Sequence, residues 1–272
     1  MRVAVVGHVE WIDFVPVDHV PVAGEIVHGR ESWAEPAGGG AVAAVQLARL
    51  AGGASFFTAL GQDEFGERSR TRLAELGVAL HAAVRSEPTR RAFTYLDASG
   101  ERTITTLGDR LAPRGEDALP WAALGEADAV YFTAGDTDAA RLARSARILV
   151  VSPRAAQTLG PVAADVVVYS RNDALEREAA ASLVPEPGLS VATEGSAGGS
   201  WRSADGETGR WEPTNPPGPV RDQYGSGDCF AAGLTFALAA GRPIGQALEL
   251  AARCGAWCAS GRGPYEGQLT RA

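Results

Sequence analysis

The chain has 272 residues, a formal net charge of −8 and 45% hydrophobic residues. This length suits one large domain, and the acidic balance without any basic block argues against a nucleic-acid surface. All 25 basic residues are arginine. A Walker P-loop protein and a Schiff-base enzyme are therefore excluded, because both need a lysine.

The cysteines and the apolar runs indicate the cellular compartment of the protein. The three cysteines, Cys229, Cys254 and Cys258, give no disulfide framework, which fits a reducing compartment. The N-terminal residues lack the apolar length of a signal peptide, and no apolar run reaches the ~18 residues of a membrane span. We therefore expect a cytoplasmic protein that binds neither membrane nor nucleic acid.

Short apolar runs alternate with helical segments along most of the chain. Val3–Gly7 is typical of the first, buried strand of a parallel sheet. Further strands are expected at 56–61, 129–134, 148–152, 166–170 and 189–193, and helices at 41–51, 68–76, 229–240 and 245–259. This alternation predicts an α/β fold with a doubly wound, mostly parallel sheet and right-handed crossovers.

Two turn-rich β segments, residues 9–35 and 88–112, interrupt the alternation. Pro21–Val27 is expected to form a turn that leads into an edge strand, and 92–97 to pair with 102–107 as a hairpin. We expect a single domain over residues 1–272 in which these two segments form a small β-sheet lid. Closure of a lid would exclude water from a site beneath it. Lid sheets with an apolar outer face often pair, which predicts a homodimer.

Two glycine-rich segments each precede a predicted helix. Gly38-Gly39-Gly40 stands before an alanine-rich run, and Gly225-Ser226-Gly227 stands directly before Asp228. Free amides at a helix N-terminus bind anions, and a carboxylate beside them can take the proton of an attacking hydroxyl, so the second segment suits phosphoryl transfer. An aspartate that caps a buried helix is equally common, and the spacing alone leaves both interpretations open.

The stretch Asp222-x-x-Gly225-Ser226-Gly227-Asp228-x-Phe230-x-x-Gly233 resembles the C-terminal signature of the ribokinase-like (PfkB-type) carbohydrate kinases. Other segments resemble that family in the same order along nearly the whole chain; they lie at 21–25, 38–51, 61–66, 97–102 and 193–198. The resemblance implies a ribokinase-like fold. It also implies transfer of a phosphoryl group from ATP, with Mg²⁺, to a hydroxyl of a small molecule such as a sugar, a sugar derivative or a nucleoside.

The resemblance further implies roles for individual residues. Asp228 would be the catalytic base, with Gly225, Ser226 and Gly227 as the anion hole. Substrate would contact Asp13, Gly38, Gly39 and Gly40; ATP would contact Thr193, Gly195, Gly198 and Asp222; and magnesium would be held by Asn172, Asp173 and Glu176.

The chain departs from the family at the substrate loop. Ala43 and Gly40 occupy the places where many members carry an asparagine and ribokinases a lysine. We therefore expect ribose to be a poor substrate. A better substrate would be less hydroxylated, or would carry a base or an aromatic group at that end.

Two other functions are open at this stage. A non-catalytic small-molecule or nucleotide sensor on the same fold would also explain the departures, although the intact Asp228 argues against it. A Rossmann-type oxidoreductase needs G-x-G-x-x-G after its first strand, which Gly7-His8-Val9-Glu10 does not provide.

Overall fold

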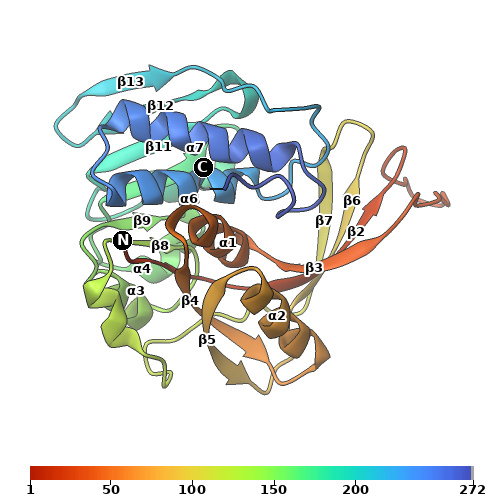
Figure 1. Ribbon diagram of the computed structural model, residues 1–272, viewed down its shortest axis with the longest axis horizontal. Helices are drawn as coiled ribbons and strands as arrows, with labels where there is room; N and C mark the ends of the chain where they lie inside the picture. The colour runs from red at the N-terminus through yellow and green to blue at the C-terminus, as the bar shows by residue number, and fades with distance from the viewer. Residues whose placement is uncertain (271–272) are drawn as a thin grey trace.

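A nine-stranded sheet forms the centre of the protein, whose computed structural model describes residues 1–270 (Figure 1). The strand order is β13-β12-β11-β10-β9-β8-β1-β4-β5, and all neighbours pair in parallel except β12 and β13, which are antiparallel. The strands are β1 (Val3–Val6), β4 (Ala54–Gly61), β5 (Val78–Arg85), β8 (Ala129–Phe132), β9 (Leu149–Val151), β10 (Val166–Ser170), β11 (Leu189–Thr193), β12 (Gly199–Ser203) and β13 (Thr208–Trp211).

Helices cover both faces of this sheet. One face packs against α1 (Gly39–Ala51), α2 (Glu64–Glu75), α6 (Ser226–Ala239) and α7 (Ile244–Ala259). The other packs against α3 (Thr137–Ala143), α4 (Ala156–Leu159) and α5 (Ala174–Ala181). Within β1, Val3 and Val5 join the first core, whereas Ala4 and Val6 join the second. Because β1 is buried on both faces, its sequence must be apolar without interruption. Burial of the sheet between two helical layers confirms the predicted doubly wound α/β fold.

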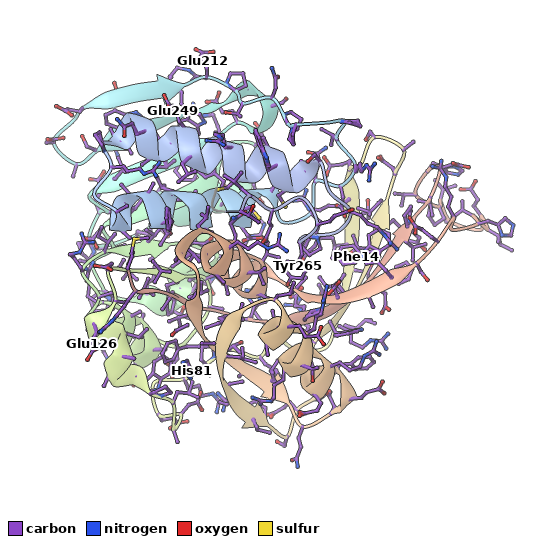
Figure 2. The ribbon with its side chains drawn as sticks, viewed as in Figure 1. Phe14, His81, Glu126, Glu212, Glu249 and Tyr265 are labelled. Atoms are coloured by element: carbon purple, nitrogen blue, oxygen red, sulfur yellow. The ribbon has the colours of Figure 1, made fainter. Side chains whose placement is uncertain are left out.

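A separate four-stranded sheet stands at one side of the molecule (Figure 1). Its order is β3 (Trp33–Ala37), β2 (Glu10–Pro16), β6 (Arg91–Leu96) and β7 (Arg102–Leu107), with β2 and β6 parallel. Figure 2 shows Phe14 and Tyr265 where this sheet meets the helical layer. Phe14 packs edge-on against Tyr224, with ring centroids 5.2 Å apart, and the Tyr265 hydroxyl donates to Pro36 O.

Several predicted elements differ from those observed. The turn expected at 21–27 is present, with Glu25 accepting a hydrogen bond from Val22 N (3.1 Å), but the edge strand that follows it, β3, begins only at Trp33. Helix α2 starts at Glu64, four residues early, because Asp63 accepts a hydrogen bond from Gly66 N (2.7 Å) and so caps it. Strand β5 was not predicted, since its half-exposed edge position leaves no clear apolar run.

The order of the strands fixes the place of a cleft. From β1 the chain moves outward to β4 and β5, and it later returns to β8 on the other side of β1. In doubly wound sheets, ligands bind beyond the carboxyl ends of the strands at such a switch point. No helix within residues 1–270 is long and apolar enough to span a membrane.

Candidate active site

A cavity of about 930 Å³ lies at this switch point. The carboxyl ends of the large-sheet strands, the N-termini of α1 and α6, and the small sheet all contribute to its wall. The wall includes His8, Glu10, Gly38, Gly39, Arg90, Arg102, Arg110, Arg154, Asn172, Asp173, Glu176, Thr193, Tyr224, Gly225, Gly227 and Asp228. The cavity therefore brings together residues from both ends of the sequence.

Asp228 lies in the first turn of α6 and faces the start of α1. A methyl group built at Gly39 would stand 2.8 Å from Asp228 Oδ1, so only a glycine leaves room for this approach. The Asp228 carboxylate accepts no hydrogen bond from any described residue. Burial raises its pKa to about 6, while the charges of Arg154 and Arg102 act to lower it. A carboxylate with such a pKa is suited to act as a general base near neutral pH.

The N-terminus of α6 presents free amides to the same place. Gly225 is the N-cap residue with a φ of 82°, and no side chain caps the helix. Ser226 and Gly227 belong to the first helical turn, so the predicted turn before the helix is shorter than expected. The helix ladder begins with Cys229 N to Gly225 O (2.9 Å), and the N–H groups of Gly227 and Asp228 have no acceptor among residues 1–270. This end of α6 can therefore bind an anion.

The start of α1 lies opposite. Gly38 has a φ of 85° and donates its N–H to the Tyr224 hydroxyl (3.1 Å). Gly38 and Gly39 line the cavity. Gly40 does not, because it packs against the end of β1, where a methyl group would stand 2.7 Å from His8 O. Two of the three predicted substrate glycines thus reach the site.

The acidic residue of β2 that lines the cavity is Glu10 and not the predicted Asp13. Asp13 lies outside the cavity wall, where it pairs with Arg91 (3.0 Å). The two acids are three positions apart on β2, so they point to opposite faces of the strand. Glu10 Oε1 lies 3.3 Å from Arg90 Nη1, and burial raises the Glu10 pKa. Alternate residues of a strand point to the same face, so the sequence could have identified Glu10 only if the face of β2 that meets the cavity had been known.

The three residues predicted to bind magnesium lie together at the other end of the cavity. Glu176 accepts from Arg154 Nε (2.7 Å) and Ser170 N (2.8 Å). Asp173 caps α5 through Leu175 N (2.9 Å), and its other oxygen is 3.8 Å from Arg154 Nη2. No cluster of three or more His, Cys, Asp or Glu side chains in the described part of the chain forms a complete metal cage. One or two carboxylates suffice for a magnesium ion that phosphates and water also hold, so the residues fit that role.

The model of the pfkB family carbohydrate kinases matches residues 1–271. The chain belongs to this family. It is therefore a phosphotransferase of the carbohydrate kinase class, which speaks against the sensor and the oxidoreductase.

Relatives of known fold and function agree with this family. An ATP-dependent ribose-1-phosphate kinase of Halopiger xanaduensis is 28% identical over 284 residues, which cover 97% of this chain and 93% of the relative. Ribokinase of Thermotoga maritima has a TM-score of 0.81 at 20% identity and covers 100% of this chain and 97% of its own. Arabidopsis thaliana ribokinase, complexed with ribose and ATP, has a TM-score of 0.74 at 19% identity, with 98% and 96% covered. The two structures establish the ribokinase fold.

In this carbohydrate kinase the predicted nucleotide residues fall into two groups. Thr193 ends β11 and lines the cavity, whereas Gly195 and Gly198 lie in the following turn, outside the cavity wall. Asp222 is only 1% exposed. Its two oxygens accept from Tyr224 N (2.8 Å) and Gly263 N (3.0 Å). Asp222 therefore braces the loop before α6 and does not face the cavity.

Proposed function

We propose that this protein transfers the γ-phosphoryl group of ATP to a hydroxyl of a sugar or sugar derivative, with Asp228 as the base. The observation that carries the proposal is the position of the Asp228 carboxylate. It is unpaired, has a raised pKa and lies between the glycine N-termini of α6 and α1. Even a partly buried carboxylate without a partner is costly unless it serves a reaction.

The chemical step follows from these groups. Asp228 accepts the proton of the acceptor hydroxyl, and the hydroxyl oxygen forms a bond to the γ-phosphorus as the bond from that phosphorus to ADP breaks. The free N–H groups of Gly227 and Asp228 stabilise the charge on the phosphoryl oxygens during transfer. A water-excluding wall favours transfer to the acceptor over hydrolysis.

The opposite end of the cavity would hold the nucleotide. Thr193 lies there, and Gly195 and Gly198 follow it in the turn that would meet the rest of ATP. Asn172, Asp173 and Glu176 would hold Mg²⁺ together with the phosphates, and the ion would neutralise phosphate charge. We expect chelation of Mg²⁺ to abolish turnover.

For the acceptor we propose contacts from Glu10 and the Gly38–Gly39 backbone, in place of the contact expected from Asp13. The Halopiger relative is named for ribose 1-phosphate, so a pentose derivative is the natural first acceptor to test. We retain the expectation that free ribose is a poor substrate. The cavity wall near Glu10 consists mainly of charged side chains, which do not favour the expected base or aromatic group on the acceptor.

The small sheet is proposed to act as a lid. Arg102, Ile104 and Thr106 of β7 alternate along the strand and line the cavity, so movement of the sheet would open or cover the site. We keep the single-domain organisation and a homodimer through this sheet as proposals. A monomer in sedimentation velocity would argue against the dimer.

The Asp228→Asn variant tests the proposed function. The change keeps size and hydrogen bonding but removes the base, so kcat should fall about 100-fold or more while ATP still binds. ADP formation with a panel of sugars and sugar phosphates gives kcat, and calorimetric titration gives ATP affinity. Turnover close to that of the wild type would overturn the role of Asp228.

A further inference from the structure

A second cavity, of about 800 Å³, lies beside the β11–β13 edge of the large sheet. Its wall comes from β10, from α5 and the loop after it, and from β11, β12 and β13. Cavities of this size bind small molecules. Tyr169, near the end of β10, lines this cavity as well as the active-site cavity. The two cavities are therefore neighbours, although Asp228 and the glycines of the proposed active site lie outside the second one.

The second cavity exists because part of the sheet has no helix over it. Strands β11, β12 and β13 follow one another through turns, so no crossover helix covers the face that α5 covers at β10. Small and polar side chains form the floor there, in two cross-strand rows: Ser190–Arg202–Thr208 and Ala192–Ser200–Arg210. Such a floor suits contact with water or with a polar ligand.

Arginine side chains surround this floor. Arg171 and Arg177 belong to the α5 side, and Arg202 and Arg210 belong to the β12–β13 hairpin. Glu186 is the only acidic residue within 1–270 that lines the cavity, and it pairs with Arg202 (2.6 Å). Arg177 donates to Arg171 O, and no carboxylate of the described chain lies within 4.0 Å of its guanidinium. In a protein with a net charge of −8, the cavity is thus a local excess of positive charge.

Glu194 stands just outside the wall and pairs with two of these arginines. Its Oε1 lies 2.9 Å from Arg171 Nε, and its Oε2 lies 2.7 Å from Arg210 Nη2. Glu194 also belongs to the turn proposed to meet ATP, between Thr193 and Gly195. Arg171 N donates to Thr193 O (2.8 Å) as well. The same contacts therefore hold the arginines of the second cavity and the start of the nucleotide turn.

The charge and shape of the second cavity match a phosphate monoester. Four guanidiniums against the two carboxylates paired with them leave a charge of +2, and a phosphate monoester carries about −1.5 to −2 near pH 7. The planar fork of a guanidinium fits phosphate oxygens. Leu183, Val184 and Pro187 add an apolar side to the wall, which suits the carbon skeleton of an ester.

We propose that the second cavity is an effector site for a small organic phosphate monoester, which lowers the affinity of the enzyme for its nucleotide. The phosphate group binds among the four arginines, and the carbon skeleton lies against the apolar side of the wall. A phosphate bound to Arg171 and Arg210 displaces Glu194, so the turn that follows Glu194 loses its anchor. This effect on the nucleotide rests on the proposed function, whereas the binding of the ester does not.

The test uses phenyl phosphate as the probe, titrated calorimetrically into the protein without nucleotide and with saturating ADP and Mg²⁺. We expect binding about tenfold tighter than that of inorganic phosphate, because the ring covers the apolar side. Saturating ADP should weaken this binding about fivefold or more without abolishing it, and phenyl phosphate should weaken ADP binding by the same factor.

Two variants should shift the affinity for phenyl phosphate in opposite directions. Arg177→Gln removes the guanidinium without an acidic partner and should weaken binding about tenfold. Glu194→Gln removes the competing carboxylate and should tighten binding about fivefold. Arg141→Gln is the matched control, because Arg141 is an exposed residue of α3 outside the cavity wall, and its affinity should equal that of the wild type. A purely structural role for these residues would not produce opposite shifts.

The outcomes separate the effector site from the proposed function. If ADP does not bind, the proposed function fails, and the variants still decide the site. Equal affinity of wild type and Arg177→Gln, or complete loss of phenyl phosphate binding with ADP, would overturn the site. An unchanged ADP affinity would overturn the regulation. A dimer in sedimentation velocity that Val184→Asp dissociates would assign this face to a second copy of the chain and would also overturn the site, since Val184 is 75% exposed.

Discussion

The phenol oxygen of Tyr224 accepts a hydrogen bond from the backbone N–H of Gly38 over 3.1 Å, although the two residues are 186 positions apart. Gly38 is the N-cap residue of α1, and Tyr224 directly precedes the N-cap of α6. This bond therefore links the N-terminus of α1 directly to the residue before the proposed anion hole. Burial and nearby carboxylate charge raise the pKa of Tyr224, so the phenol stays neutral.

The Tyr224→Phe variant should loosen this link. Removal of the acceptor leaves the Gly38 N–H buried without a partner, which costs about 1–3 kcal/mol. We expect a lower free energy of unfolding in urea and a higher KM for the acceptor, with the KM for ATP less affected. Tyr95→Phe is the matched control, since Tyr95 lies on β6 outside the cavity wall. Equal effects of the two changes would contradict a role for the Tyr224–Gly38 bond.

A Gly39→Ala change should damage the proposed base selectively. The added methyl group would stand 2.8 Å from Asp228 Oδ1, closer than side-chain contacts allow, so the carboxylate must move. Displacement of a catalytic group by about 1 Å can cost about 100-fold in rate, and we expect kcat to fall by about that factor. Gly245→Ala serves as control, because nothing lies within 4 Å of its added methyl group. An unchanged kcat for Gly39→Ala would show that Asp228 does not work from this position.

The rate should depend on pH through Asp228. Its pKa is raised from 3.8 to about 6, with burial as the main cause. The base works only when ionised, so kcat/KM should be constant well above pH 6 and should fall as the pH drops through about 6, tenfold per pH unit at the acid end. Rates measured from pH 4.5 to 8.5 with saturating Mg²⁺ give this profile. A profile that stays level down to pH 4.5 would exclude Asp228 as a base with this pKa.

Asp222 should matter for stability more than for nucleotide affinity. Its carboxylate accepts from Tyr224 N and Gly263 N while only 1% exposed, so Asp222→Ala leaves two buried N–H groups unpaired. We expect a loss of about 2–4 kcal/mol in the free energy of unfolding, measured in urea. Asp205→Ala, in the exposed turn between β12 and β13, should cost far less. A stable Asp222→Ala variant with weakened ATP binding would instead support the nucleotide contact expected from the resemblance.

Local sequence determined the fold class and the place of the proposed base. Apolar runs such as Val3–Val6 are buried on both faces and predict a parallel sheet without knowledge of their partners. The start of α6 is equally local, because Gly225 adopts a left-handed conformation and the helix begins at the next residue. The Gly225–Asp228 motif could therefore be read from the sequence, together with the family that it resembles.

Only the tertiary structure decided which other side chains share the cavity with Asp228. Asp13 and Glu10 are both acids near the end of β1, and the face of β2 that each occupies depends on how that strand pairs in the small sheet. Arg110 comes from the loop after β7 and Arg154 from a short 3-10 helix after β9, and no spacing in the sequence connects them. Asp222 belongs to the family motif, yet its burial against Gly263 removes it from the site. Charge and hydrogen bonding in the cavity arise from contacts between distant segments, which a pattern along one chain does not encode.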